Sequence, residues 1–220
     1  MFKNLADNQN PNSLAARLRK DRFSFFLSLI SRMNQPITIL DVGGSEEFWK
    51  LLMLECGMDI RVTLLNIIEQ KVSTPHFDSV IGNVLNLNLT NASFDVIFSN
   101  SVIEHIGDYE NQRKMAEVVK RVGKRYFIQT PNKYFFIEPH FLFPFFQFLP
   151  IVIRIWLVTH FAMGWFNKEP NPEYARDIIN SIHLLSKKDL LALFSGCHLY
   201  EEKVLGMTKS YIAYSGWEKN

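Results

Sequence analysis

The sequence predicts an α/β fold, with a doubly wound, mostly parallel seven-stranded sheet and helices on both faces. Short apolar stretches with strand character alternate with helical patterns along much of the chain. Strands that alternate with helices need crossover connections, which give parallel strands covered on both faces. Two β-rich stretches near the C-terminus are close enough in sequence to pair as an antiparallel edge. The predicted strands are residues 37–42, 61–65, 79–82, 94–99, 124–130, 198–207 and 209–217.

Three of the predicted helices have recognisable ends. A helix at 46–56 ends at Gly57, and a second helix at 109–123 ends with its own glycine. The third begins in "SKKDLLALF", where Ser186 is followed three residues later by Asp189, a variant of the capping box. These signals support the alternation of strands and helices.

A leading amphipathic helix is predicted within residues 1–34. Phe23, Phe26, Leu27 and Ile30 recur at i, i+3, i+4 and i+7, which places them on one face of a helix. The apolar run is short, contains serines and lacks a small-residue cleavage pattern, so we do not predict an export signal. We expect this face to pack on the domain.

Length and composition are those of one globular domain over residues 1–220. Hydrophobic residues make up 47% of the chain and charged residues 21%, which excludes a disordered chain. The net charge of +2 is too small to indicate a nucleic-acid partner. Cys56 and Cys197 form neither a disulfide framework nor a metal-ligand pattern, which favours a cytoplasmic location and predicts no metal site.

Small or hydrogen-bonding residues follow each of the first four predicted strands. In open α/β sheets, ligands bind beyond the carboxyl ends of the strands, where small residues let a ligand approach the backbone. A carboxylate after the first strand would repel a pyrophosphate, and the third glycine of a dinucleotide-binding loop is missing. The residues are Asp41, Gly43 and Gly44 after the first strand, Asn66 after the second, Gly82, Asn83 and Val84 after the third, and Ser99, Asn100 and Ser101 after the fourth.

Four motifs carry a resemblance to a known family. "ILDVGGS", "VTLLN", "IGNV" and "FDVIFSNSVIEHI", in this order and spacing, resemble the motifs of class I S-adenosylmethionine-dependent methyltransferases over residues 36–132. The resemblance implies the strand order 3-2-1-4-5-7-6. It also implies that S-adenosyl-L-methionine lies across the ends of strands 1 to 4 and leaves as S-adenosyl-L-homocysteine.

The resemblance also implies roles for individual residues. Asp41 would interact with the methionine part of the cofactor, directly or through water, and Ser99, next to Asn100, would hold its methionine end. The loop of Gly43, Gly44 and Ser45 would pass beneath the cofactor, Asn66 would hold the ribose hydroxyls, and Asn83 and Val84 would hold the adenine.

Two departures from the family pattern predict weaker cofactor binding. Ser45 and Glu47 replace the second and third glycines of the usual loop, and the neutral Asn66 replaces an acid, for which Glu69 is a candidate substitute. Hydrogen bonds to charged groups are stronger than neutral ones by about 1 kcal/mol, so we expect affinity lower by about tenfold. A non-catalytic cofactor-binding or membrane-surface module that keeps the fold is therefore the alternative function.

Three side chains are the candidates for catalysis. Methyl transfer needs a general base only when the acceptor is protonated, as a hydroxyl is. His105 follows the fourth strand, and Glu138 and His140 follow the fifth, in the region that commonly lines the acceptor pocket in related methyltransferases. Alternatively, His105 orients a loop or the cofactor, and His140 is a buried histidine bonded to the backbone.

A phenylalanine-rich insertion at residues 133–182 follows the fifth strand. Pro144, Pro150 and Arg154 interrupt its apolar run, so a membrane-spanning helix fits poorly. Three interpretations compete: a lid over an apolar acceptor pocket, a hairpin resting on a membrane surface, or a homodimer contact through residues 141–166. The lid is favoured, although Arg154 and Trp156 would also suit a headgroup boundary. The sequence thus predicts a methyltransferase that acts on a small molecule, with a bulky or lipophilic acceptor favoured and oxygen as the methylated atom. It also predicts a protein of the cytoplasm, either soluble or peripherally attached to a membrane.

Overall fold

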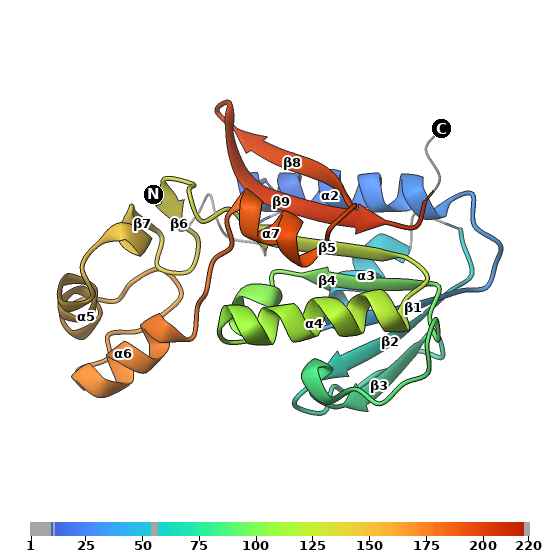
Figure 1. Ribbon diagram of the computed structural model, residues 1–220, viewed down its shortest axis with the longest axis horizontal. Coiled ribbons are helices and arrows are strands. Elements are labelled where there is room, and N and C mark those ends of the chain that lie inside the picture. Colours follow the sequence, from blue (N-terminus) through green and yellow to red (C-terminus); the bar gives the residue numbers. More distant parts are fainter. Residues whose placement is uncertain (1–9, 11, 54–56, 218–220) are drawn as a thin grey trace.

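The computed structural model, which describes all residues except 1–9, 11, 54–56 and 218–220, contains the predicted α/β sheet (Figure 1). The seven strands have the order β3-β2-β1-β4-β5-β9-β8, the same pattern as the predicted order. Strands β1 to β5 pair in parallel, whereas β9 is antiparallel to both β5 and β8. Their bounds are β1 Ile37–Val42, β2 Ile60–Asn66, β3 Phe77–Ile81, β4 Val96–Asn100, β5 Tyr126–Pro131, β8 His198–Val204 and β9 Met207–Ser215.

The carboxyl ends of the first four strands meet at one edge of the sheet. Val42 of β1 lies beside Leu65 of β2 and Ser99 of β4. Asn66, the last residue of β2, lies beside Ile81, the last residue of β3. The parallel register therefore brings the ends of these four strands to the same edge of the sheet.

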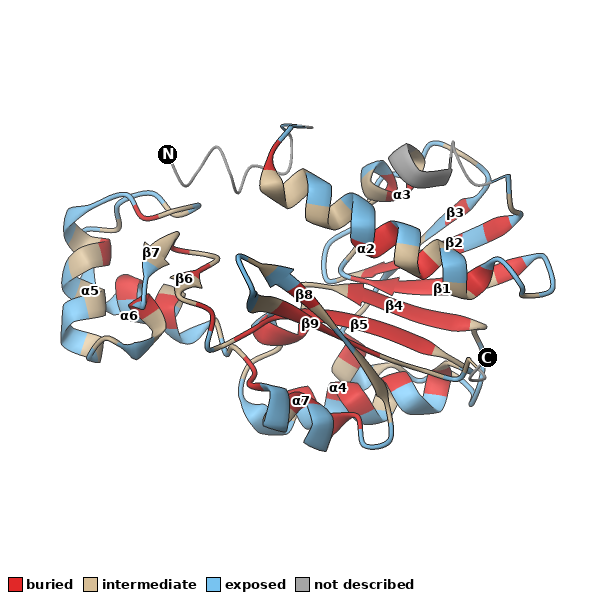
Figure 2. Ribbon diagram, turned by 90° about the horizontal axis from the view of Figure 1, so that it is seen from above, coloured by how far each residue is buried: buried red, intermediate tan, exposed pale blue. Residues whose placement is uncertain are grey.

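Two layers of helices cover the sheet (Figures 1 and 2). Helices α2, Leu14–Ile30, and α3, Glu46–Met53, pack on one face. Helices α4, Tyr109–Val122, and α7, Lys187–Leu193, pack on the other. Figure 2 shows that β1, β4 and β5 are buried along most of their length. The predicted end of the α3 helix, at residues 54–56, lies outside the described residues.

The helix boundaries follow from side-chain caps. The Asp108 side chain accepts a hydrogen bond from the backbone N–H of Asn111 and starts α4. The predicted capping box at α7 is confirmed, because Ser186 and Asp189 each bond to the other's backbone N–H. These bonds satisfy N–H groups that the first turn of a helix leaves without partners.

The leading helix α2 is an integral part of the core. Phe26 is 0% exposed, and its ring centroid lies 5.0 Å from that of Phe98 and 5.1 Å from that of Phe127. Of the predicted face, Leu27 is only partly buried. Phe25, which the helical spacing did not select, stacks on Tyr200 at 4.7 Å between centroids. The helix therefore contacts the sheet over a wider face than the four-residue pattern predicts.

The insertion forms a small unit with its own core beyond the carboxyl end of β5 (Figure 1). It contains a two-stranded hairpin and two helices that pack on each other. Its buried apolar residues are Phe141, Phe146, Val158, Met163, Ala175 and Ile179. The elements are β6 Ile137–Glu138, β7 Phe143–Pro144, η3 Phe146–Phe148, α5 Ile151–His160 and α6 Pro172–Asn180.

Much of helix α5 is exposed or only partly buried (Figure 2), and several of the exposed side chains of the insertion are apolar. Val152 is 72% exposed and Trp156 is 51% exposed. Within the described residues, none of the helices has the length and apolar character needed to cross a membrane. The membrane-surface and homodimer interpretations stay predictions.

The packing of α2 predicts a large loss of stability in the Phe26→Ala variant. Removing a fully buried phenylalanine leaves a cavity that a close-packed core fills only in part, at a cost of about 3–5 kcal/mol in the free energy of unfolding. Urea denaturation followed by circular dichroism measures this loss. Leu205→Ala, at a side chain that is 86% exposed, is the control and should change stability by less than about 0.5 kcal/mol. Equal effects of the two substitutions would contradict the role of α2 in the core.

Candidate cofactor and acceptor site

The loop after β1 requires glycine at two consecutive positions. Gly43 has φ +77°, a conformation that other residues rarely adopt, and an added Cβ would lie 2.6 Å from Cγ2 of Val102. At Gly44, an added Cβ would lie 1.6 Å from Oδ2 of Asp41. The backbone of this loop therefore lies at the end of β1 with no side chain at either glycine, as close approach of a ligand requires.

Asp41 lies beneath the loop, in the core. It is 1% exposed, and its Oδ2 accepts a 2.6 Å hydrogen bond from the indole N–H of Trp49. Its Oδ1 has no hydrogen-bond partner among the described residues. Burial raises the pKa of Asp41 to about 7, against the opposing effect of the Trp49 hydrogen bond. The carboxyl group thus supports the loop from inside, and its contact with the methionine part of the cofactor stays a prediction.

Asn66 connects the end of β2 to the same loop. Its Nδ2 donates a 3.0 Å hydrogen bond to the carbonyl of Gly44, and the backbone N–H of Gly43 donates to the carbonyl of Leu65 at 2.9 Å. The first two candidate positions therefore form one unit, with the Asn66 carboxamide at the edge where the ribose is expected.

After β3, the candidate residues form a short helical turn. The side chain of Asn83 accepts a 2.9 Å hydrogen bond from the backbone N–H of Leu85 and begins the 3₁₀-helix η1, Val84–Asn86. Val84 is buried in the same core cluster as Val42 and Leu65. Ser45 begins the turn into α3, since its hydroxyl lies 3.4 Å from the backbone N–H of Phe48.

The residues at the end of β4 contact structural partners that lie far away in the sequence. Ser99 is fully buried, with its hydroxyl 3.5 Å from the carbonyl of Val42. The side chain of Asn100 accepts a hydrogen bond from Arg22 of α2, which also makes a two-bond ion pair with Glu202 of β8 at 2.8 and 2.7 Å. Arg22 and Glu202 are 180 positions apart, so no local sequence signal could have paired them.

The three catalytic candidates lie together, although they come from two separate segments. Nε2 of His105 lies 3.1 Å from Nε2 of His140, and Nδ1 of His140 lies 2.7 Å from Oε1 of Glu138. Oε2 of Glu138 accepts hydrogen bonds from the backbone N–H groups of His140 at 2.8 Å and Phe141 at 2.6 Å. Both Glu138 oxygens are therefore engaged, so this carboxylate positions His140.

Glu104 is a fourth member of this cluster, and the sequence analysis gave it no chemical role. It is 0% exposed, accepts a 3.0 Å hydrogen bond from Thr130 at Oε2, and has no partner at Oε1 among the described residues. Burial raises the pKa of Glu104 to about 7. Its position in the 3₁₀-helix η2, Ile103–His105, one residue before His105, is the signal that could have indicated it.

The environment of the two imidazoles shifts their pKa values in opposite directions. Partial loss of contact with water lowers the pKa of His105 to about 4, and the neighbouring His140 contributes to this shift. Burial lowers the pKa of His140, but its hydrogen bond to Glu138 and the charge of that carboxylate outweigh burial and raise it. His140 is therefore the more basic member of the pair.

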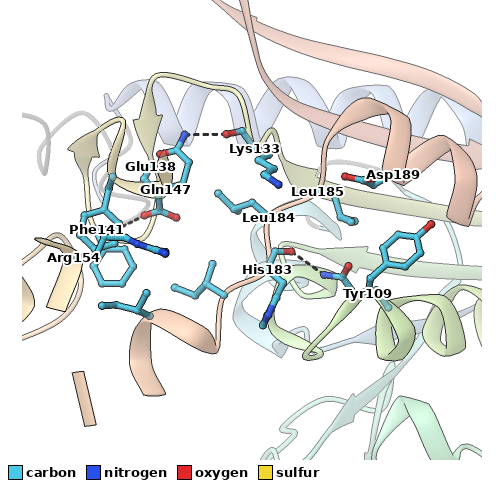
Figure 3. Close-up of a pocket in the computed structure, with 14 residues that line it drawn as sticks. Tyr109, Lys133, Glu138, Phe141, Gln147, Arg154, His183, Leu184, Leu185 and Asp189 are labelled. Carbon is cyan, nitrogen blue, oxygen red and sulfur yellow. Dashed lines mark hydrogen bonds between the residues drawn. The ribbon is translucent and has the colours of Figure 1, made fainter. Parts of the chain in front are cut away.

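A pocket of about 420 Å³ lies between the insertion and the main domain (Figure 3). Figure 3 shows Glu138 and Arg154 on the insertion side, with Leu184 and His183 across from them. Apolar side chains also line it, namely Phe141, Phe146, Ile179, Ile182 and Leu185. No side chain assigned to the cofactor lines this pocket. Arg154 points into the pocket, so it does not lie at an outer headgroup boundary as the sequence interpretation allowed.

Comparison with known proteins supports the resemblance found in the sequence. Residues 40–126 match the family model described as a methyltransferase domain, and this range includes the ends of β1 to β4 and the 3₁₀-helix η2. The match covers less than half of the chain, in the part that carries the four motifs. No curated protein matches the chain.

Solved structures of methyltransferases share the fold of this chain at low sequence identity. One is a SAM-dependent methyltransferase from Aquifex aeolicus, with TM-score 0.50, 14% identity, and 90% of this chain and 91% of that chain covered. Another is from Methanosarcina mazei, with TM-score 0.53, 12% identity and coverage of 84% and 93%. A third is the N-methyltransferase NodS from Bradyrhizobium japonicum, with TM-score 0.51, 11% identity and coverage of 94% and 97%. This chain spans only 46% and 59% of matched proteins from Galdieria sulphuraria and Nostoc punctiforme.

The buried carboxyl group of Asp41 predicts a pH-dependent stability of the protein. Its folded pKa of about 7 exceeds the ordinary value of 3.8, so the folded protein retains this proton between those pH values while the unfolded chain releases it. The contribution of Asp41 to the free energy of unfolding therefore falls as pH rises from about 4 to about 7. The total decrease is at most about 4 kcal/mol. Asp41→Asn keeps an acceptor for Trp49 and removes this titration.

Urea denaturation of both proteins at pH 4.5 and pH 7.5 measures the effect. We expect Asp41→Asn to gain stability relative to the unmodified protein on going to the higher pH. Because the two proteins share every other titrating group, the change in their difference isolates Asp41. A difference that is the same at both pH values would contradict the assignment.

Proposed function

We propose that this methyltransferase transfers a methyl group from S-adenosyl-L-methionine to an oxygen atom of a small acceptor with an apolar body. The supporting observation is the arrangement of two sites along one edge of the sheet. The glycine loop and the ends of β1 to β4 lie on the cofactor side, and a 420 Å³ pocket lies beside the cluster after β4 and β5. Pockets of about 300–1,000 Å³ are typical of small-molecule sites.

The residues at the strand ends fit the cofactor. Gly43 and Gly44 leave the loop backbone uncovered, and the Asn66 carboxamide can bond to vicinal hydroxyls. Asn83 and Val84 lie at the neighbouring strand end, where the adenine is expected. When bound, S-adenosyl-L-methionine supplies an activated methyl group on a sulfonium. The protein's main task is then to align the acceptor and exclude water.

The pocket suits an acceptor that is apolar over most of its surface. Phe141, Ile182 and Leu184 provide apolar walls. Because Phe141 belongs to the insertion, its position on the lining supports a lid role for that segment. Two cationic side chains, Lys133 and Arg154, lie on the same lining as the carboxylates of Glu138 and Asp189. Nε of Arg154 has no hydrogen-bond partner among the described residues, which favours an acceptor that also carries a polar or acidic group.

Glu138 connects the pocket to the imidazole pair, since it lines the pocket and accepts from His140. A hydroxyl acceptor must lose its proton during transfer, and His105 and His140 are the side chains that we propose to receive or orient it. Glu138 acts through His140 and is a positioning residue.

The role of Asn66 predicts a loss of cofactor affinity in Asn66→Ala. The variant loses the hydrogen bonds to the ribose and to the Gly44 carbonyl, so we expect the dissociation constant for S-adenosyl-L-methionine to rise about five- to tenfold. Isothermal titration calorimetry measures it. Asn180→Ala, at an exposed asparagine at the end of α6, is the matched control and should leave the constant unchanged. An unchanged constant in a correctly folded Asn66→Ala variant would exclude this role.

The acceptor pocket predicts that Leu184→Trp blocks methyl transfer without affecting the cofactor. The larger side chain occupies acceptor space, so we expect the rate of methyl transfer to fall by about tenfold or more, while cofactor affinity stays the same. The assay follows labelled methyl transfer to a panel of small aromatic and aliphatic alcohols, with and without a carboxylate. Leu205→Trp, on an exposed turn, is the control. Transfer to amines alone would refute oxygen as the acceptor atom, and full activity in Leu184→Trp would refute the pocket.

A further inference from the structure

The residues Glu104, His105 and His140 form a cluster with the composition of a metal site. Each residue offers one ligand atom, and these atoms all lie within 4.8 Å of one another. They come from two segments, the 3₁₀-helix η2 after β4 and the loop after β6. We propose that these three residues bind a divalent transition-metal ion, with zinc as the best chemical match.

The geometry of the two imidazoles supports this proposal. The rings are perpendicular, and their Nε2 atoms lie 3.1 Å apart. Oε1 of Glu138 lies 2.7 Å from Nδ1 of His140, so this carboxylate favours the tautomer with the proton on Nδ1, which leaves the lone pair of Nε2 directed toward His105. Two ligand atoms, each about 2.0–2.1 Å from a tetrahedral zinc ion, would lie about 3.3 Å apart, close to the distance found here.

A second and independent observation comes from Glu104. Its side chain is 0% exposed, and Oε1 has no hydrogen-bond partner among the described residues. A buried carboxylate oxygen without a partner is costly, and buried charges are normally paired or coordinate a metal. An ion between the carboxylate and the two imidazoles would give this oxygen its missing partner.

The surroundings of His140 match those of a metal-binding histidine. Such histidines commonly donate their second ring N–H to a carboxylate, which fixes the ring and raises its basicity. Glu138 has this position, and it is held in place by the backbone N–H groups of His140 and Phe141. His105 is exposed, which gives an ion access from solvent.

The ligand set indicates the type of ion and its use. Imidazole nitrogens favour zinc and neighbouring transition metals, whereas calcium and magnesium prefer oxygen ligands. Three protein ligands are the number found in catalytic zinc sites, which keep a further position for water or substrate. On the basis of the proposed function, an ion here would bind the acceptor oxygen and make its proton easier to remove.

The competing explanation is a hydrogen bond between the two imidazoles, with a proton on Glu104. Metal binding distinguishes the two explanations, and it can be measured without cofactor or acceptor. Failure of the metal proposal is therefore separate from failure of the proposed function. The experiment uses the untagged full chain, treated with a chelator and dialysed, and titrated with Zn²⁺ by calorimetry and with Co²⁺ by visible absorption.

We expect about one equivalent of each ion to bind, with Co²⁺ giving the visible bands of a low-coordinate site. His105→Ala and Glu104→Gln should weaken binding by about 100-fold or more, and Glu138→Gln, which removes an outer partner, by about 10–100-fold. His76→Ala, at an exposed histidine outside the cluster, should bind as the unmodified protein does. Circular dichroism confirms that each variant is folded.

Two results would overturn the proposal. One is the absence of Zn²⁺ and Co²⁺ binding to the unmodified protein at micromolar concentrations. The other is equal binding by the unmodified protein and by folded His105→Ala, because His105 is exposed and its removal should leave the fold intact.

Discussion

The site depends on one constraint, the parallel pairing of β1 with β2 on one side and β4 on the other. Backbone hydrogen bonds between the strands hold this register, so the alignment of the strand ends does not depend on the side chains of the site. Asp41 and Gly44 then fit together so closely that neither position tolerates a different shape. The loop, the Asn66 carboxamide and the buried Ser99 follow from that alignment. A ligand meets a surface made mainly of fixed backbone.

Much of the sheet could be predicted because its strands are short apolar runs with clear ends. The first strand was predicted at its observed bounds, and the strand order agrees with the structure. The third strand begins at Phe77 rather than residue 79, since this edge strand is partly exposed and its polar Asp78 obscures the pattern. Contacts between distant segments were beyond the sequence. Glu104 reads as an ordinary surface acid until the fold shows that it is buried.

The insertion shows why apolar composition alone does not determine a surface. Its sequence is apolar almost all round, so no periodicity separates inner from outer side chains. In the structure, turns near Pro144 and Pro150 divide it, Phe141 and Phe146 form a core, and Trp156 is exposed. The same folding turns Arg154 inward to a pocket. Thus one segment has two faces, one that lines a pocket and one that is exposed to solvent.

The ion pair between Arg22 and Glu202 has a consequence for how the protein is made. Both side chains are almost fully buried, and removing one partner would leave the other charge without compensation, which costs about 3–5 kcal/mol. Synthesis proceeds from the N-terminus, so α2 emerges from the ribosome long before β8 exists. The aromatic face of α2 can pack on β4 and β5 as soon as they are made. The Arg22 side chain of the same helix is without its carboxylate partner until β8 follows.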